Sequence, residues 1–202
     1  MRYLGIKYAL DRVIAVLALL ALAPAMALIA AAVRQDADGS VIFRQRRIGQ
    51  DGRPFVVYKF RTMRATAPTY SAKVPDDHPW VTRVGRVLRR TALDELPQLW
   101  NIARGEMSWV GPRPEQPFLV ERYTERERAR LRARPGLTGW WQVKHRGVHP
   151  MHEDIELDLY YVEHLSPWLD LKIVLLTPWA LARQDRSSRR AGSPAVADVS
   201  AD

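Results

Sequence analysis

Residues Val13–Val33 form an uncharged apolar run of 21 residues that lies between Arg12 and Arg34. About 20 such residues are enough for a helix to cross the hydrocarbon core of a bilayer, so the run predicts a membrane segment. A secretory signal peptide fits poorly, because its apolar region is usually only about 7–15 residues long. We therefore expect a membrane-associated chain.

Pro24 lies in the middle of this run. It lacks an N–H donor and its ring collides with the carbonyl of Leu20, which bends or breaks a helix at mid-depth. Basic residues flank the run on both sides and draw both of its ends toward the cytoplasm: they are Lys7, Arg12, Arg34, Arg44, Arg46 and Arg47. A re-entrant helix satisfies both ends, whereas a kinked span satisfies one. The residues alone leave both readings open.

The charge balance narrows the classes of partner. The chain carries 31 Lys and Arg against 22 Asp and Glu, a net charge of +9. Such an excess predicts an anionic partner, which is a nucleic acid, a phosphorylated small molecule or an acidic membrane surface. The chain has no cysteine, which excludes a disulfide scaffold, a thiol nucleophile and a cysteine-ligated metal site.

The remaining sequence predicts a mostly α fold with one small β-hairpin, an α+β class. The hairpin joins Ser40–Arg46 to Pro54–Arg61 through a turn at Asp51-Gly52. Residues 65–80 are predicted to form a loop, and residues 184–202 a disordered tail. The predicted helices are Thr82–Arg90, Asp94–Gly105 with Asp94 as its N-cap, Val120–Arg134, and Glu153–Leu181 with a break at Ser166-Pro167.

Two of these helices carry surface patterns. In Val120–Arg134, arginines recur every four residues and form one stripe, either a solvated face paired with Glu125 and Glu127 or a face toward phosphates; they are Arg122, Arg126, Arg130 and Arg134. The 14-residue stretch Trp168–Leu181 is too short and too charged to span a bilayer. It suits either an amphipathic helix in the membrane interface or a buried core helix.

The adjacent carboxylates Asp94 and Glu95 are the main candidates for chemistry. They can hold a hard cation such as Mg²⁺ together with substrate phosphates, or one can attack while the other manages protons. Basic residues that could neutralise a diphosphate are Lys59, Arg61, Arg89 and Arg113. The alternative is purely structural, with Asp94 capping its helix and Glu95 exposed.

Five ordered motifs resemble the bacterial sugar transferases known as monotopic phosphoglycosyl transferases. They are Lys59–Met63 (KFRTM), Leu93–Gln98 (LDELPQ), Asn101–Pro114 (NIARGEMSWVGPRP), Pro135–Val143 (PGLTGWWQV) and Glu156–Tyr161 (ELDLYY). The resemblance runs from about Tyr3 to Thr177, and the chain is similar to the small, catalytic-domain-only form of the family.

The resemblance implies a reaction at the cytoplasmic face of the bacterial plasma membrane. Members of the family transfer a phosphosugar from a UDP-sugar to polyprenol phosphate and release UMP, which initiates a surface glycan. It implies that Asp94 is the nucleophile and a Mg²⁺ ligand, that Glu95 assists, and that Lys59, Arg89 and Arg113 bind substrate. Nucleic acid is then not an expected partner. The competing hypotheses are a membrane-anchored nucleic-acid-binding protein and a metal-dependent phosphatase or nuclease.

The resemblance also bears on the membrane segment. In the family this segment is a re-entrant helix broken by a Ser-Pro pair, and here Ala23-Pro24 stands in that place. We therefore expect a re-entrant membrane helix over residues 1–35, a compact catalytic region with interfacial helices over 36–183, and a tail over 184–202.

Overall fold

The computed structural model describes residues 2–69, 74–145 and 154–190. These residues form a mostly helical fold with two small two-stranded sheets, which confirms the predicted class and adds a sheet that the sequence did not indicate. The strands are β1 (Ile42–Ile48), β2 (Pro54–Phe60), β3 (Ser108–Val110) and β4 (Gly136–Thr138). The α-helices are α1 (Arg2–Asp36), α2 (Arg83–Thr91), α3 (Gln98–Arg104), α4 (Pro117–Val120), α5 (Glu125–Arg128), α6 (Trp140–His145), α7 (Ile155–Glu163) and α8 (Pro167–Arg190). Short 3₁₀ turns are η1 (Gln50–Gly52), η2 (Leu93–Glu95) and η3 (Ala129–Arg132).

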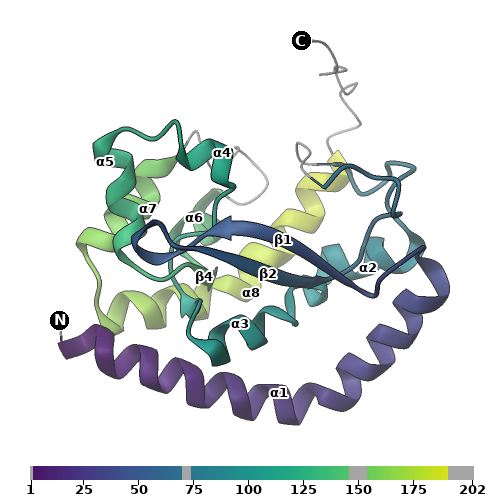
Figure 1. The fold of residues 1–202 in the computed structure, drawn as a ribbon, viewed down its shortest axis with the longest axis horizontal. Coiled ribbons are helices and arrows are strands. Elements are labelled where there is room, and N and C mark those ends of the chain that lie inside the picture. Colours follow the sequence, from purple (N-terminus) through teal and green to yellow (C-terminus); the bar gives the residue numbers. More distant parts are fainter. Residues whose placement is uncertain (1, 70–73, 146–153, 191–202) are drawn as a thin grey trace.

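Helix α1 is a single curved helix along one edge of the molecule (Figure 1). We expected a break at Ala23-Pro24, but the helix continues through Pro24 without interruption. A proline has a helix-compatible φ and removes one hydrogen bond, which a long helix can tolerate. Within the described residues, α1 is the one helix long and apolar enough to cross a membrane, and outward side chains such as Leu20 and Leu28 are exposed.

Both ends of α1 are attached to the same globular body. Near its start, Lys7 forms an ion pair with Asp170 at 2.8 Å, and Asp11 accepts a hydrogen bond from the Ser108 hydroxyl. At its other end, the Asp36 carboxylate accepts a hydrogen bond from the backbone N–H of Val84 at 2.6 Å. Ala15, between them, is fully buried in a core cluster with residues of α3. The inner side of α1 therefore contacts the body at its start, its middle and its end.

The β1–β2 hairpin crosses the middle of the molecule and confirms the prediction (Figure 1). Its turn places Asp51 and Gly52 in the left-handed region, at φ 55° and 76°, as an Asp-Gly pair permits. The register pairs Phe43 with Lys59 and Arg47 with Phe55. Because side chains alternate along a strand, Lys59 and Arg47 share one face of the hairpin.

The predicted Asp94–Gly105 helix is wrong at its start. Helix α2 follows its N-cap Thr82 close to the predicted bounds, but Ala92 then adopts the left-handed region and Leu93–Glu95 form the 3₁₀ turn η2. Helix α3 begins only after Pro97, which has no N–H to continue an α-helical turn back to Leu93. Asp94 is therefore not the N-cap of a helix, although Gly105 ends α3 as predicted.

The predicted helix Val120–Arg134 is also wrong. Thr124 and Glu127 form a reciprocal capping box that starts a new short helix, so α4, α5 and η3 replace one continuous helix. The arginine stripe is consequently not assembled. Arg126 lies exposed beside Glu156, whereas Arg130 is fully buried beside Asp158.

The C-terminal helices confirm the break at Ser166-Pro167, since α7 ends at Glu163 and α8 begins at Pro167. Helix α8 continues to Arg190, into the stretch 184–202 that was predicted as a tail, and residues 191–202 lie outside the described part. In α8, Leu169 and Ile173 pack into a core cluster with Tyr161, while Trp168 and Trp179 are exposed. Helix α8 thus has one buried face and one exposed apolar face.

Candidate active site

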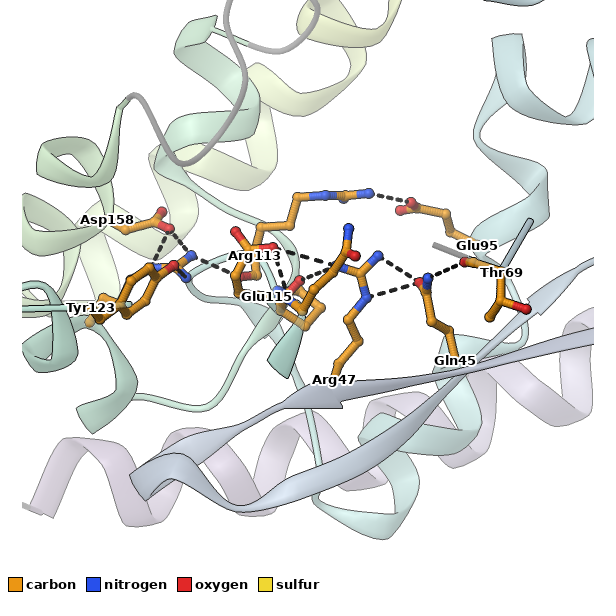
Figure 2. A network of polar contacts seen from close by, with 11 residues as sticks. Gln45, Arg47, Thr69, Glu95, Arg113, Glu115, Tyr123 and Asp158 are labelled. Carbon is orange, nitrogen blue, oxygen red and sulfur yellow. Dashed lines mark hydrogen bonds and ion pairs between the residues drawn. The ribbon is translucent and has the colours of Figure 1, made fainter. Parts of the chain in front are cut away.

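Glu95 is the point where three separate elements meet. It lies in η2, is buried, and its Oε1 accepts hydrogen bonds from Lys59 Nζ at 2.7 Å and from Arg113 Nη2 at 3.3 Å. Lys59 comes from the end of β2, and Arg113 from the segment after β3 (Figure 2 shows Arg113 reaching Glu95). The structure therefore brings together three of the residues that the sequence predicted, and it overturns the alternative in which Glu95 is exposed.

Asp94 precedes Glu95 in the same turn and is half-buried. Its negative charge acts on both Lys59 and Arg113. The two carboxylates thus share the same pair of cations, although Glu95 alone is drawn into the interior.

The charges in this cluster perturb one another. Burial lowers the pKa of Lys59, which Glu95 opposes and the positive charge of Arg113 reinforces. Burial acts in the same direction on Arg113, but Glu95 and Asp94 outweigh it and the pKa of Arg113 is raised. Arg113 is therefore the permanent cation of the site, and Lys59 is the cation that can lose its proton.

Arg89 has a different environment. Its guanidinium donates to the carbonyl of Val74 at 3.0 Å and lies near Asp76, at 3.8 Å, and near the sulfur of Met63. These contacts tie α2 to the end of the 65–80 loop. In the described part of the chain, no hydrogen bond or ion pair joins Arg89 to Glu95, so its assignment to the site remains a prediction.

The segment 113–115 is held by side chains for which the sequence predicted no role in the site. Arg47 of β1 donates to the carbonyl of Pro114 at 3.3 Å and pairs with Glu115 at 3.6 Å. Gln45 accepts two hydrogen bonds from Arg47 and donates to the carbonyl of Thr69 (Figure 2). The alternation of β1, which places Arg47 and Lys59 on one face, is a signal that could have indicated this role.

The side chains near Asp94 offer few ligands for a hard cation. Among the described residues, no group of three or more His, Asp or Glu side chains gathers into a metal-binding cluster. Glu95 is hydrogen-bonded to two cations, and Asp94 is the adjacent, half-buried carboxylate of the same turn. Mg²⁺ is commonly held by one or two carboxylates, water and substrate phosphates, so the arrangement fits a metal that arrives with a diphosphate.

Comparison with known proteins places this site in a family. The profile of the bacterial sugar transferases matches residues 2–184, which includes all the site residues above. The chain belongs to the bacterial sugar transferase family. Membership accounts for the ordered motifs from Lys59 to Tyr161.

Three relatives illustrate the range of this family. A UDP-glucose:undecaprenyl-phosphate glucose-1-phosphate transferase of Escherichia coli K12 is 42% identical over 85% of this chain and 39% of its own length. A UDP-N-acetylgalactosamine-undecaprenyl-phosphate N-acetylgalactosaminephosphotransferase of Aeromonas hydrophila is 40% identical over 87% of this chain and 43% of its own. The exopolysaccharide production protein ExoY of Sinorhizobium fredii is 42% identical over 85% of this chain and 83% of its own. The chain thus spans about two fifths of the length of the first two relatives.

Proposed function

We propose that this chain transfers a sugar 1-phosphate from a UDP-sugar to undecaprenyl phosphate, releasing UMP and initiating polysaccharide synthesis. The observation that carries the proposal is the geometry at Glu95, where one buried carboxylate draws Lys59 and Arg113 together beside Asp94. Two converging cations suit a diphosphate, and the adjacent carboxylate suits attack on it. Relatives named for this reaction support the assignment.

In the first step, a carboxylate oxygen of Asp94 bonds to the β-phosphorus of the donor, and the bond from that phosphorus to the bridging oxygen breaks. UMP leaves with the electron pair. An anionic nucleophile meets an anionic diphosphate, so Lys59 and Arg113 must neutralise the phosphate oxygens before attack. Glu95 orients both cations through its hydrogen bonds.

In the second step, a phosphate oxygen of undecaprenyl phosphate attacks the same phosphorus and displaces Asp94, which regenerates the carboxylate. This order gives ping-pong kinetics through an aspartyl-phosphosugar intermediate. Asp94 would hold the Mg²⁺ ion, which supplies further charge neutralisation on the diphosphate. Arg89 is assigned to substrate binding through the family motif alone.

The attachment of α1 supports a membrane arrangement for the chain. Because Lys7 and Asp11 at one end and Asp36 at the other contact one body, both ends of the helix belong on one side of the bilayer. We assign residues 1–35 to a re-entrant membrane helix and residues 36–183 to the catalytic region at the cytoplasmic face. The exposed apolar face of α8, with Trp168 and Trp179, would lie in the interface with the lipids.

Asp94→Asn tests the proposed function. The purified protein in detergent with Mg²⁺ and undecaprenyl phosphate should release UMP from at least one member of a panel of UDP-sugars, and the variant should release essentially none. The panel is needed because the relatives act on different sugars. Retained turnover in Asp94→Asn contradicts the role of Asp94. Release of inorganic phosphate without lipid acceptor supports a phosphatase instead.

A further inference from the structure

The buried arginine of the predicted stripe has a partner that the proposed chemistry does not yet use. Arg130 is 1% exposed, and its Nη2 donates to the backbone carbonyl of Arg113 at 2.8 Å. Its Nε donates to Asp158 Oδ2 at 3.1 Å, and its Nη1 to the hydroxyl of Tyr123 at 2.9 Å. Burying a charge costs desolvation free energy, so the hydrogen bonds and the ion pair that compensate for this cost are hard to replace.

The surroundings keep Arg130 in place. Asp158 is fully buried in α7 and forms an ion pair with the guanidinium, while Tyr123 lies before α5 on the other side (Figure 2 shows Tyr123 beside Asp158). Burial raises the pKa of Tyr123 to about 12, so its hydroxyl stays neutral and able to accept. The Arg130 guanidinium is therefore fixed from two elements, and it also donates to the backbone carbonyl of Arg113.

A second arginine, Arg47 of β1, contacts the same segment, residues 113–115. Arg47 bonds to the carbonyl of Pro114 and pairs with Glu115, and it stands on the hairpin face that also carries Lys59. The backbone of 113–115 is thus held by α7 through Arg130 and by the hairpin through Arg47. The Arg113 side chain leaves this segment and reaches Glu95.

We propose that Arg130 and Arg47 form a clamp that positions the Arg113 guanidinium against Glu95 and the donor diphosphate. The clamp residues are the four side chains Arg47, Glu115, Arg130 and Asp158. They are positioning residues, since they act on Arg113 through the backbone of 113–115 and through one another. The inference rests on the proposed function for its kinetic readout, because Arg113 is the residue through which the clamp acts.

A double-mutant cycle with Arg113 tests this proposal. Arg47→Gln should lower kcat/KM for the UDP-sugar by about 10- to 100-fold, since small misplacement of a substrate-binding group has effects of that size. In an Arg113→Met background, Arg47→Gln should produce no further loss, because the clamp then has nothing to position. Losses that multiply in the double variant overturn the proposal.

Arg126→Gln is the matched control. It removes the same charge from an exposed ion pair with Glu156 that makes no contact with 113–115, and surface pairs of this kind contribute little. Its kcat/KM should stay within twofold of the unchanged protein. A loss equal to that of Arg47→Gln shows that net charge, and not the clamp, is responsible.

Hydrogen exchange supplies a readout that is independent of activity. Peptides that cover 111–116 should exchange faster in Arg47→Gln and in Asp158→Asn than in Arg126→Gln. If the Asp158 variant fails to fold, the variant of the partly buried Arg47 still decides. If the protein without substitutions releases no UMP, the proposed function fails. The exchange measurement then still tests the clamp. Faster exchange at 111–116 in the Arg47→Gln variant supports the clamp, and exchange equal to that of the protein without substitutions overturns it.

Discussion

The two neighbouring carboxylates take different positions because of the turn that carries them. In a 3₁₀ turn consecutive residues are about 120° apart, so Glu95 can point inward to Lys59 and Arg113 while Asp94 lies at the partly exposed side. Asp94 and Glu95 therefore cannot be exchanged for one another. Glu95 organises the cations, and under the proposed function Asp94 is the residue that meets the substrate.

The protonation of Lys59 should limit activity at alkaline pH. Burial lowers its pKa, so Lys59 loses its proton at lower pH than an ordinary lysine, and affinity for the diphosphate should fall as pH rises through that value. Lys59→Arg should flatten this decline in kcat/KM, because a guanidinium stays protonated. Glu95→Gln should move the decline to lower pH, since Glu95 raises the Lys59 pKa. An unchanged decline in both variants assigns it to another group.

Backbone strain next to the site gives a second residue-scale prediction. Ala92 has φ 56°, a left-handed conformation that costs a side-chain-bearing residue about 1 kcal/mol. Ala92→Gly should therefore raise Tm by about 2–4 °C, measured by thermal unfolding in detergent. Ala103→Gly, inside α3, is the control and should lower Tm, because glycine weakens a helix interior. A fall in Tm for Ala92→Gly contradicts the strain argument.

At the scale of elements, the sequence correctly predicted several features that a few neighbouring residues determine. The Asp-Gly turn, the start of a helix at Thr82 and the break at Ser166-Pro167 are each encoded within a few residues, and each is confirmed. The interruption of Val120–Arg134 was also encoded locally, by the Thr124–Glu127 capping box, but the arginine periodicity obscured it.

Long-range contacts account for the rest. The parallel β3–β4 pair depends on glycines at a close backbone approach, where a side chain on Gly111 would lie 2.2 Å from the Arg134 carbonyl. The site was predictable as a set through Glu95, Lys59 and Arg113, because the family motifs contain them. The burial of Arg130 was not predictable, since its partner Asp158 lies in a separate helix.

Asn101 joins two elements and gives the prediction at this scale. It is fully buried in α3, its Oδ1 accepts from Tyr58 N, and its Nδ2 donates to Val56 O at 2.6 Å and to Glu106 at 2.8 Å. Asn101→Ala leaves buried backbone groups of β2 unpaired and should destabilise the fold by about 3 kcal/mol. Tm should fall by at least about 6 °C. The exposed Arg126→Gln change serves as control, and an equal shift in both contradicts this role.

At the scale of the molecule, paired cations lie both at the start of α1 and around Glu95. The cations at Lys59 and Arg113 gather on Glu95, while Lys7 pairs with Asp170 at the start of α1. The buried pair at Lys7 ties the membrane helix to α8, whose exposed apolar face lies on the same body. The depth of α1 in the bilayer should therefore fix the height of Asp94 above it.

Cysteine labelling tests this arrangement, because the chain has no cysteine of its own. Gly5→Cys introduces a side chain that meets no atom within 4 Å, and Asp38→Cys replaces a side chain that is 72% exposed. Since both ends of α1 contact one body, a membrane-impermeant maleimide should label both positions in inside-out vesicles and neither in right-side-out vesicles. Leu20→Cys, 70% exposed but in the apolar run, should resist the reagent in both. Labelling of positions 5 and 38 from opposite sides establishes a true span, and it would require the contacts of Asp11 or Asp36 with the body to open in the membrane.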